Sequence, residues 1–191
     1  AYTMLLEEYG TPDTWEDKSH IGVANKFAEK LNLGRICLPT RDPNCYTSAI
    51  TYTTLTGYKR DGSQFLTGAE GQLKDMFVEF RMDSTTCRGV NQYSWTSVTE
   101  KSPYWHMCGN INVDINGSKQ PNRYGVDLFS FVFTDNKIIP LGTPPNPYYS
   151  LNSSCNPKLL DSWDGSTNGN FCAAWIIVNK NMDYLRKKIS W

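Results

Sequence analysis

Hydrophobic and polar residues follow two different periods along this chain, and the period changes near residue 50. Before that point, apolar residues recur every three or four positions, which is typical of amphipathic helices. We predict a helix over residues 1–9 that ends at Gly10, with an apolar stripe formed by Tyr2, Leu5, Leu6 and Tyr9. A second helix is predicted to end at Gly34, with a stripe formed by Ile21, Ala24, Phe27, Ala28 and Leu31.

After residue 50 the apolar residues alternate with polar ones, which predicts β-strands. Six short segments rich in β-branched and aromatic residues are predicted as strands: ITYTTLT, DMFVEFRM, NINVDI, DLFSFVF, KIIP and CAAWIIV. Helices first and strands later indicate an α+β fold with an antiparallel sheet. We expect one domain over residues 1–191, with a helical part at 1–34 and a β-rich part at 50–191.

The stretch NVDINGSKQPNRYGVDLF, residues 112–129, admits two interpretations. It begins like an EF-hand loop, but Arg123 stands where the bidentate glutamate belongs, so an EF-hand is excluded. The favoured interpretation is a hairpin with strands at 110–115 and 127–133 and a loop at 116–126. Asn and Gly form its first turn. The competing interpretation is an irregular calcium site in which Asp114 and Asp127 share the cation.

Six cysteines without zinc-site spacing indicate three disulfides and an oxidising compartment. Fifteen pairings are possible for six cysteines. We predict pairing in chain order: Cys37 with Cys45, Cys87 with Cys108, and Cys155 with Cys172.

The remaining composition argues against several functional classes. Acidic and basic residues are equal at 19 each, so the overall charge gives no indication of nucleic-acid binding. No sequence motif of a hydrolase, metalloprotease or nucleotide-binding protein is present, so we expect no enzyme, cofactor or metal. His20 and His106 are interpreted as structural or surface residues. The charged groups of Glu7, Glu8 and Arg186–Lys188 are interpreted as solvated surface charges.

Four stretches resemble the globular part of bacterial type IV pilin-like proteins, the prepilin family that includes the pseudopilins of type II secretion. They follow in the same order from residue 5 to about residue 185: LLEEYGTPDTW, INVDINGSKQPNRYGVDLFSFVF, KIIPLG and CAAWIIVNKNMDYL. The second and fourth stretches are the more specific ones. The second contains Asp-x-Asn-Gly, Pro-Asn and Gly-x-Asp, and the fourth contains Cys-x-Ala-Trp and Asn-Met-Asp-Tyr-Leu.

The resemblance implies a pilin-like fold in which residues 1–9 are the last part of a long helix. In such proteins the preceding apolar half of the helix anchors the precursor in the inner membrane and later packs in the filament core. The family's Gly-Phe-Thr-Leu-x-Glu cleavage region is not present here, so we expect the leader and the apolar half-helix to have been removed. Met76 stands where related sequences have Asp-Gly, which predicts a continued strand in place of a tight turn.

Two functional classes follow from the resemblance. The first is a structural subunit of an extracellular pilus or secretion pseudopilus. It would face the periplasm before assembly and contact other subunits through the missing helix and the globular surfaces. The second is a minor pilin or adhesin that binds a glycan, a surface protein or DNA. Its best candidate segment is 83–108, which contains Tyr93, Trp95, Tyr104 and Trp105.

Overall fold

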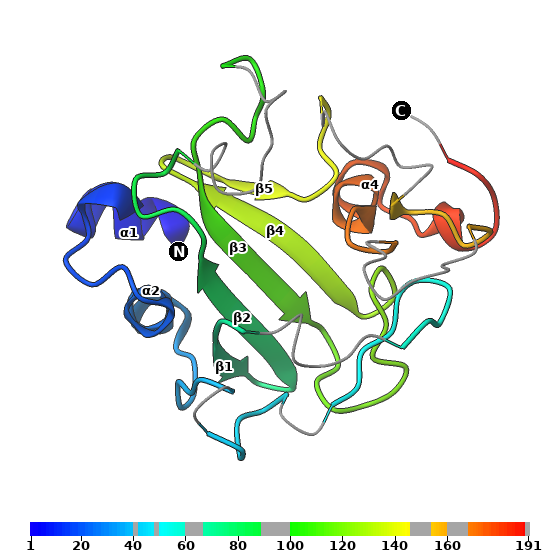
Figure 1. Cartoon of the computed structure of the whole chain (residues 1–191), viewed down its shortest axis with the longest axis horizontal. Coiled ribbons are helices and arrows are strands. Elements are labelled where there is room, and N and C mark those ends of the chain that lie inside the picture. Colours follow the sequence, from blue (N-terminus) through cyan, green and yellow to red (C-terminus); the bar gives the residue numbers. More distant parts are fainter. Residues whose placement is uncertain are drawn as a thin grey trace.

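The chain forms an α+β fold around one antiparallel sheet (Figure 1). The computed structural model describes residues 1–39, 42–47, 50–59, 67–88, 100–145, 154–159 and 168–189. The sheet consists of β1 (Ala69–Leu73), β2 (Met76–Met82), β3 (Met107–Asp114), β4 (Leu128–Thr134) and β5 (Ile138–Pro140). Every strand pairs with its neighbours in the sequence, in the order β1-β2-β3-β4-β5. The predicted antiparallel α+β class is therefore confirmed.

The helices lie on the two sides of this sheet. Helix α2 (His20–Leu31) packs against β1 and β2, and helix α1 (Tyr2–Tyr9) packs against α2. The short 3₁₀ helix η1 (Pro12–Thr14) joins the two helices. Helix α4 (Cys172–Asn179) packs against β4 and β5 and is followed by the 3₁₀ helix η4 (Asp183–Leu185). The apolar residues of β4 therefore alternate between two covered faces.

Aromatic rings attach α1 and α2 to the sheet. The ring of Tyr2 stacks on Phe27 at 5.6 Å, and Phe27 stacks on Phe80 of β2 at 4.7 Å. The hydroxyl of Tyr2 donates a hydrogen bond to the backbone carbonyl of Thr134 at the end of β4. Leu5 is fully buried in the same cluster. The prediction that the first helix packs on an antiparallel sheet is confirmed.

The second helix ends earlier than predicted. Its N-terminus is capped by Ser19, whose hydroxyl accepts a hydrogen bond from the N–H of Gly22 at 3.0 Å. Asn32 takes the left-handed conformation that ends the helix, with a φ of 53°. The N–H of Gly34, the predicted terminator, instead donates to the carbonyl of Gln72 on β1. Asparagine ends the helix because it tolerates this backbone conformation better than most residues.

Three strand predictions are wrong. CAAWIIV is the helix α4, because a short apolar run has no period that separates strand from helix, and its two alanines favour the helix. ITYTTLT forms only isolated bridges, because Thr53 exchanges backbone hydrogen bonds with the loop residues Asn122 and Tyr124. Met76 begins β2, but a tight turn at Lys74 and Asp75 precedes it in place of a continued strand. Lys74 provides the positive φ, 56°, that this turn needs.

All six cysteines form disulfides in the predicted chain-order pairing. The bonds join Cys37 to Cys45, Cys87 to Cys108, and Cys155 to Cys172. Such a set is typical of proteins that fold in an oxidising environment, outside the cell or in the periplasm. Among the described helices, none has both the length and the hydropathy that a membrane span requires.

Candidate functional site

A row of polar side chains crosses four strands of the sheet at one register position. Glu70 on β1 pairs directly with Glu79 on β2, Glu79 pairs with Asn112 on β3, and Asn112 pairs with Ser130 on β4. Side chains at paired positions lie on the same face of a sheet, so these four residues adjoin one another. Both glutamates are buried, with 0% and 3% exposure. We call these four residues the polar row.

Hydrogen bonds satisfy each member of the polar row. The carboxylate of Glu70 accepts from both the N–H and the hydroxyl of Thr47. The carboxylate of Glu79 accepts from the N–H of Gly68 at 2.7 Å and from the side-chain amide of Asn112 at 2.5 Å. Ser130 donates to the amide oxygen of Asn112 at 2.6 Å. Glu79, Asn112 and Ser130 therefore form one hydrogen-bonded chain, and Glu70 is satisfied separately by Thr47, so each buried polar group has a partner.

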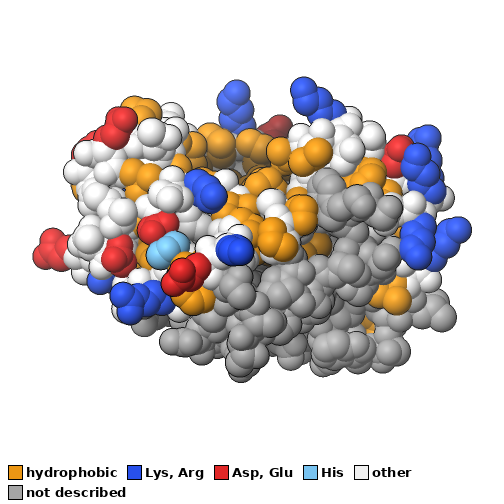
Figure 2. All heavy atoms as spheres, turned by 90° about the horizontal axis from the view of Figure 1, so that it is seen from above, with side chains coloured by type: hydrophobic (Ala, Val, Ile, Leu, Met, Phe, Trp, Pro, Cys, Tyr) orange, Lys and Arg blue, Asp and Glu red, His pale blue; other side chains and the backbone are white. Residues whose placement is uncertain are grey.

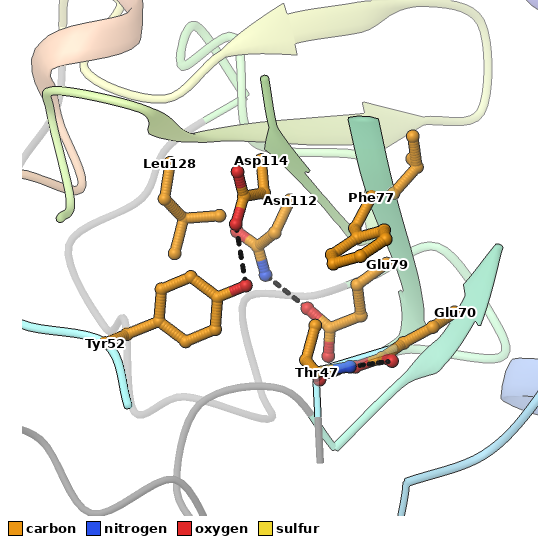
Figure 3. Close-up of a pocket in the computed structure, with 9 residues that line it drawn as sticks. Thr47, Tyr52, Glu70, Phe77, Glu79, Asn112, Asp114 and Leu128 are labelled. Carbon is orange, nitrogen blue, oxygen red and sulfur yellow. Dashed lines mark hydrogen bonds between the residues drawn. The ribbon is translucent and has the colours of Figure 1, made fainter. Parts of the chain in front are cut away.

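A third buried carboxylate lies beside the polar row (Figure 3). Asp114, at the end of β3, is 2% exposed and accepts a hydrogen bond of 2.8 Å from the hydroxyl of Tyr52. A cavity of about 10 Å³ lies between this pair and the two glutamates, and Phe77 also lines it. That volume admits at most one water molecule. The space is therefore too small for an organic substrate.

Burial changes the acidity of these carboxyl groups. Loss of solvation raises the pKa of Glu70 from 4.5 to about 7, against the opposing hydrogen bonds from Thr47. The same cause raises the pKa of Glu79, and it raises the pKa of Asp114 from 3.8 to about 6. The negative charges of neighbouring carboxylates also act in this direction. Glu70 and Asp114 therefore bind protons near neutral pH, and the cavity that they line has room for no more than one water molecule.

The β3–β4 loop is closed by a different carboxylate. Asp127 accepts hydrogen bonds from the N–H groups of Asn122 at 2.8 Å and Arg123 at 2.5 Å, and from the side-chain amide of Asn116 at 3.2 Å. At the other end of the loop, Asp114 accepts from the N–H of Asn116 at 3.2 Å. Gly117 has the positive φ, 63°, that the predicted turn requires. These contacts are those of a long hairpin loop.

The carboxylates of Asp114 and Asp127 are both used inside the protein. Each of their four oxygens accepts a hydrogen bond from a backbone or side-chain donor. In the described part of the chain, the single group of three side chains spaced to hold a metal is Cys37, Cys45 and Glu70. Its two sulfurs form a disulfide and are not available as thiolate ligands. The arrangement favours the hairpin interpretation of this loop.

The two histidines have local structural contacts. His20, the first residue of α2, accepts a hydrogen bond of 3.2 Å from the N–H of Met82 on β2. Burial lowers its pKa, which favours the neutral ring that this bond needs. His106 lies 3.3 Å from the carboxylate of Asp135, and its side chain is mostly exposed. Neither contact gives a nucleophile–base pair.

The predicted binding segment is only partly described. Tyr93 and Trp95 lie outside the described residues, and Trp105 is half-buried. Tyr104 is 1% exposed, and its hydroxyl accepts from the N–H of Gly142 at 3.1 Å and donates to the carbonyl of Thr143 at 3.0 Å. The expectation that Tyr104 offers a ring to a ligand is wrong, because this ring fills the core beneath β4 and β5.

The predicted surface charges lie on the surface. Glu7 and Glu8 are exposed on α1, and Glu8 forms an ion pair with Lys30 of α2. The cluster Arg186–Lys188 is exposed near the C-terminal end of the chain. The polar row has no signal of its own in the sequence, because the alternation in β2 places Glu79 only on the face opposite the apolar Val78 and Phe80.

The two stretches with the more specific resemblance meet in space. The hydroxyl of Tyr184 in η4 donates a hydrogen bond of 2.6 Å to the carbonyl of Gly125 in the β3–β4 loop. A Cβ at Gly125 would lie only 2.8 Å from the Sγ of Cys172, so a larger residue would clash with the disulfide there. A scan against protein-family models found no match, and searches of curated proteins and of solved structures found none either.

Proposed function

We propose that this chain is the globular head of a subunit in a pilin-like filament, either a type IV pilus or a type II secretion pseudopilus. The observation that carries the proposal is the meeting of the β3–β4 loop with the C-terminal segment. The stretches that most resemble the pilin-like family contribute Gly125 from one side and Cys172 and Tyr184 from the other. The resembling residues thus share one structural unit, which supports a common fold over a chance similarity.

The position of α1 also supports the proposal. Tyr2 and Leu5 attach this helix to the sheet through a fully buried aromatic cluster. Its outer face, with Met4 and Glu7, remains exposed. In a pilin-like subunit an apolar helix would precede α1 and pack in the filament core, and the sheet would lie outside it. A rigid attachment of α1 to the sheet would then fix the head relative to the core.

The chemistry of the buried carboxylates supports a structural role. Glu70, Glu79 and Asp114 are enclosed, and their oxygens accept hydrogen bonds from the protein itself. A general acid or base must reach its substrate within about 3 Å or through one water. Among the described residues these groups border a cavity that admits at most one water molecule, so their satisfied hydrogen bonds support a role in holding the sheet together.

The test is the location of the protein in the cells that make it. Antibodies raised against this domain should label filaments sheared from the cell surface, or short pseudopilus fibres, in immunogold electron microscopy. Pre-incubation with the purified domain should abolish the label and provides the control. Label confined to soluble or membrane fractions would overturn the proposal. Binding of the purified domain to a glycan array or to DNA would favour the binding-module class.

A further inference from the structure

The two ends of the molecule carry opposite charges. Residues 1–31, which form α1, η1 and α2, contain six acidic and three basic residues. Residues 172–189, which form α4 and the segment after it, contain four basic residues and one acidic residue. These segments lie at opposite ends of the long axis (Figure 1). Figure 2 shows acidic side chains gathered toward the first end and basic side chains toward the second.

The first end presents an acidic face with an apolar centre. Met4 on α1 is 55% exposed, and Glu7 and Glu8 follow it at helical spacings of three and four residues. These three side chains therefore lie on one outer face of α1, away from the buried Tyr2 and Leu5. In the described part of the chain Glu7 takes part in no ion pair, so its charge is available to a partner. We call this surface the α1 face.

The second end presents a basic face with an apolar centre. Ile177 and Val178 at the end of α4 are 56% and 65% exposed. Lys180 follows them, and Arg186 and Lys188 are exposed in the segment after η4. Among the described residues, none of these three cations forms an ion pair. We call this surface the α4 face. Its apolar centre and cationic surround complement those of the α1 face.

We propose that the α1 face of one copy of this chain binds the α4 face of the next copy. The two surfaces differ, so the contact is head-to-tail, and each copy keeps one free face of each kind. Such heterologous contacts build open filaments unless the rotation between copies closes a ring. The proposal deepens the filament function proposed above and depends on it for its biological setting.

Charge explains why a second copy is the expected occupant. The net charge of the chain is zero, so two copies do not repel one another as wholes. The separated charges favour the orientation that brings unlike ends together, and they disfavour contacts between like ends. The apolar centres supply area that is lost from water on contact. A nucleic acid or an anionic membrane would match the α4 face but would be repelled by the α1 face.

The test is self-association of the purified domain, measured by sedimentation velocity over a range of concentrations. At about 10 mM ionic strength, where the screening length is about 30 Å, the domain should associate. At about 1 M, where that length is about 3 Å, association should weaken by at least about tenfold. The variants Glu7→Lys/Glu8→Lys and Lys180→Glu/Arg186→Glu should each abolish self-association at low salt.

The decisive measurement is made on a mixture of these two variants. One variant has two basic ends and the other has two acidic ends, so the mixture should regain association that neither variant shows alone. The matched control for Lys180→Glu/Arg186→Glu is Lys119→Glu/Lys137→Glu, which makes the same charge change at two exposed lysines elsewhere. It should associate like the wild type. Circular dichroism of every variant should match the wild type, because all substituted side chains are at the surface.

Three outcomes overturn the inference: no association at low salt, association that both reversals leave unchanged, and failure of the mixture to associate. If the purified domain stays monomeric but the filaments carry the antibody label, this contact is refuted and the filament proposal stands. If the two charge-reversal variants associate only when they are mixed, but no filament carries the antibody label, the filament proposal is refuted and the contact is supported.

Discussion

Replacing Glu70 with glutamine separates the hydrogen bonding of the polar row from its charge. Glutamine has the same length, and its amide matches both partners on Thr47. Its carbonyl oxygen can accept from the N–H that now lies 3.0 Å from the carboxylate, and its amide nitrogen can donate to the hydroxyl oxygen. The Glu70→Gln variant therefore keeps the network and removes the buried ionisation opposite Glu79.

The expected size of the effect follows from the pKa of Glu70. Burial raises this pKa from 4.5 to about 7, and each pKa unit corresponds to about 1.4 kcal/mol. Between these two pH values the folded protein keeps a proton that the unfolded chain has lost. The free energy of unfolding must therefore fall as the pH rises through this window, by about 3 kcal/mol in total. The contribution is fully retained below pH 4.5 and is lost above pH 7.

Urea titrations at pH 5 and pH 8, with the disulfides intact, measure this dependence. The wild type should lose about 2.5 kcal/mol more than Glu70→Gln between the two pH values, because part of the effect is already lost at pH 5, and the variant should be the more stable protein at pH 8. The contribution of Asp114, whose pKa is also raised, cancels in the comparison. The control Glu7→Gln, at an exposed position, should behave like the wild type. If the free energy of unfolding depended on pH equally in the wild type and in Glu70→Gln, burial would not raise the pKa of Glu70 as inferred.

Three further predictions concern α1 and the β3–β4 loop. Leu5→Ala should lower the free energy of unfolding by about 2–5 kcal/mol in denaturant titration, because Leu5 is fully buried, whereas exposed Met4→Ala should change it by less than about 0.5 kcal/mol. Tyr52→Phe should cost about 1–3 kcal/mol at pH 8 and less at pH 5, because its hydroxyl donates to a carboxylate that is charged only above about pH 6; an equal cost at both pH values would contradict this. The melting midpoint should be the same with chelator and with calcium, because the oxygens of Asp114 and Asp127 already accept hydrogen bonds; a calcium-dependent rise would show that the loop binds the metal.

Residues close together in the sequence were sufficient to predict helix α1, strand β4 and the hairpin of β3 and β4. The apolar stripe of Tyr2 and Leu5 predicted α1, because helix periodicity is a property of nearby residues. The alternation around Phe129 and Phe133 predicted β4. The hairpin of β3 and β4 followed from Asn-Gly and Pro-Asn, whose preferences for turns are also local.

Long-range contacts determine the features that the sequence did not predict. The segment CAAWIIV becomes α4 through its packing beside β4 and β5, and this packing leaves no periodic signal in the sequence. The burial of Glu70 depends on Thr47, which is 23 residues away in the sequence and satisfies its carboxylate. From the sequence alone, a glutamate in a predicted strand is expected to be exposed, because burying a carboxylate without such a partner is costly.

The most direct test of the filament assignment is a helical reconstruction, by electron cryomicroscopy, of filaments that carry the antibody label. We expect a repeating density that fits the described fold, with the sheet β1–β5 outside the filament core. The α1 face of one subunit should meet the α4 face of a neighbour. The filament assignment would be contradicted if this fold could not be placed in a well-resolved repeat and if mass spectrometry of the same filaments detected no peptides of this chain.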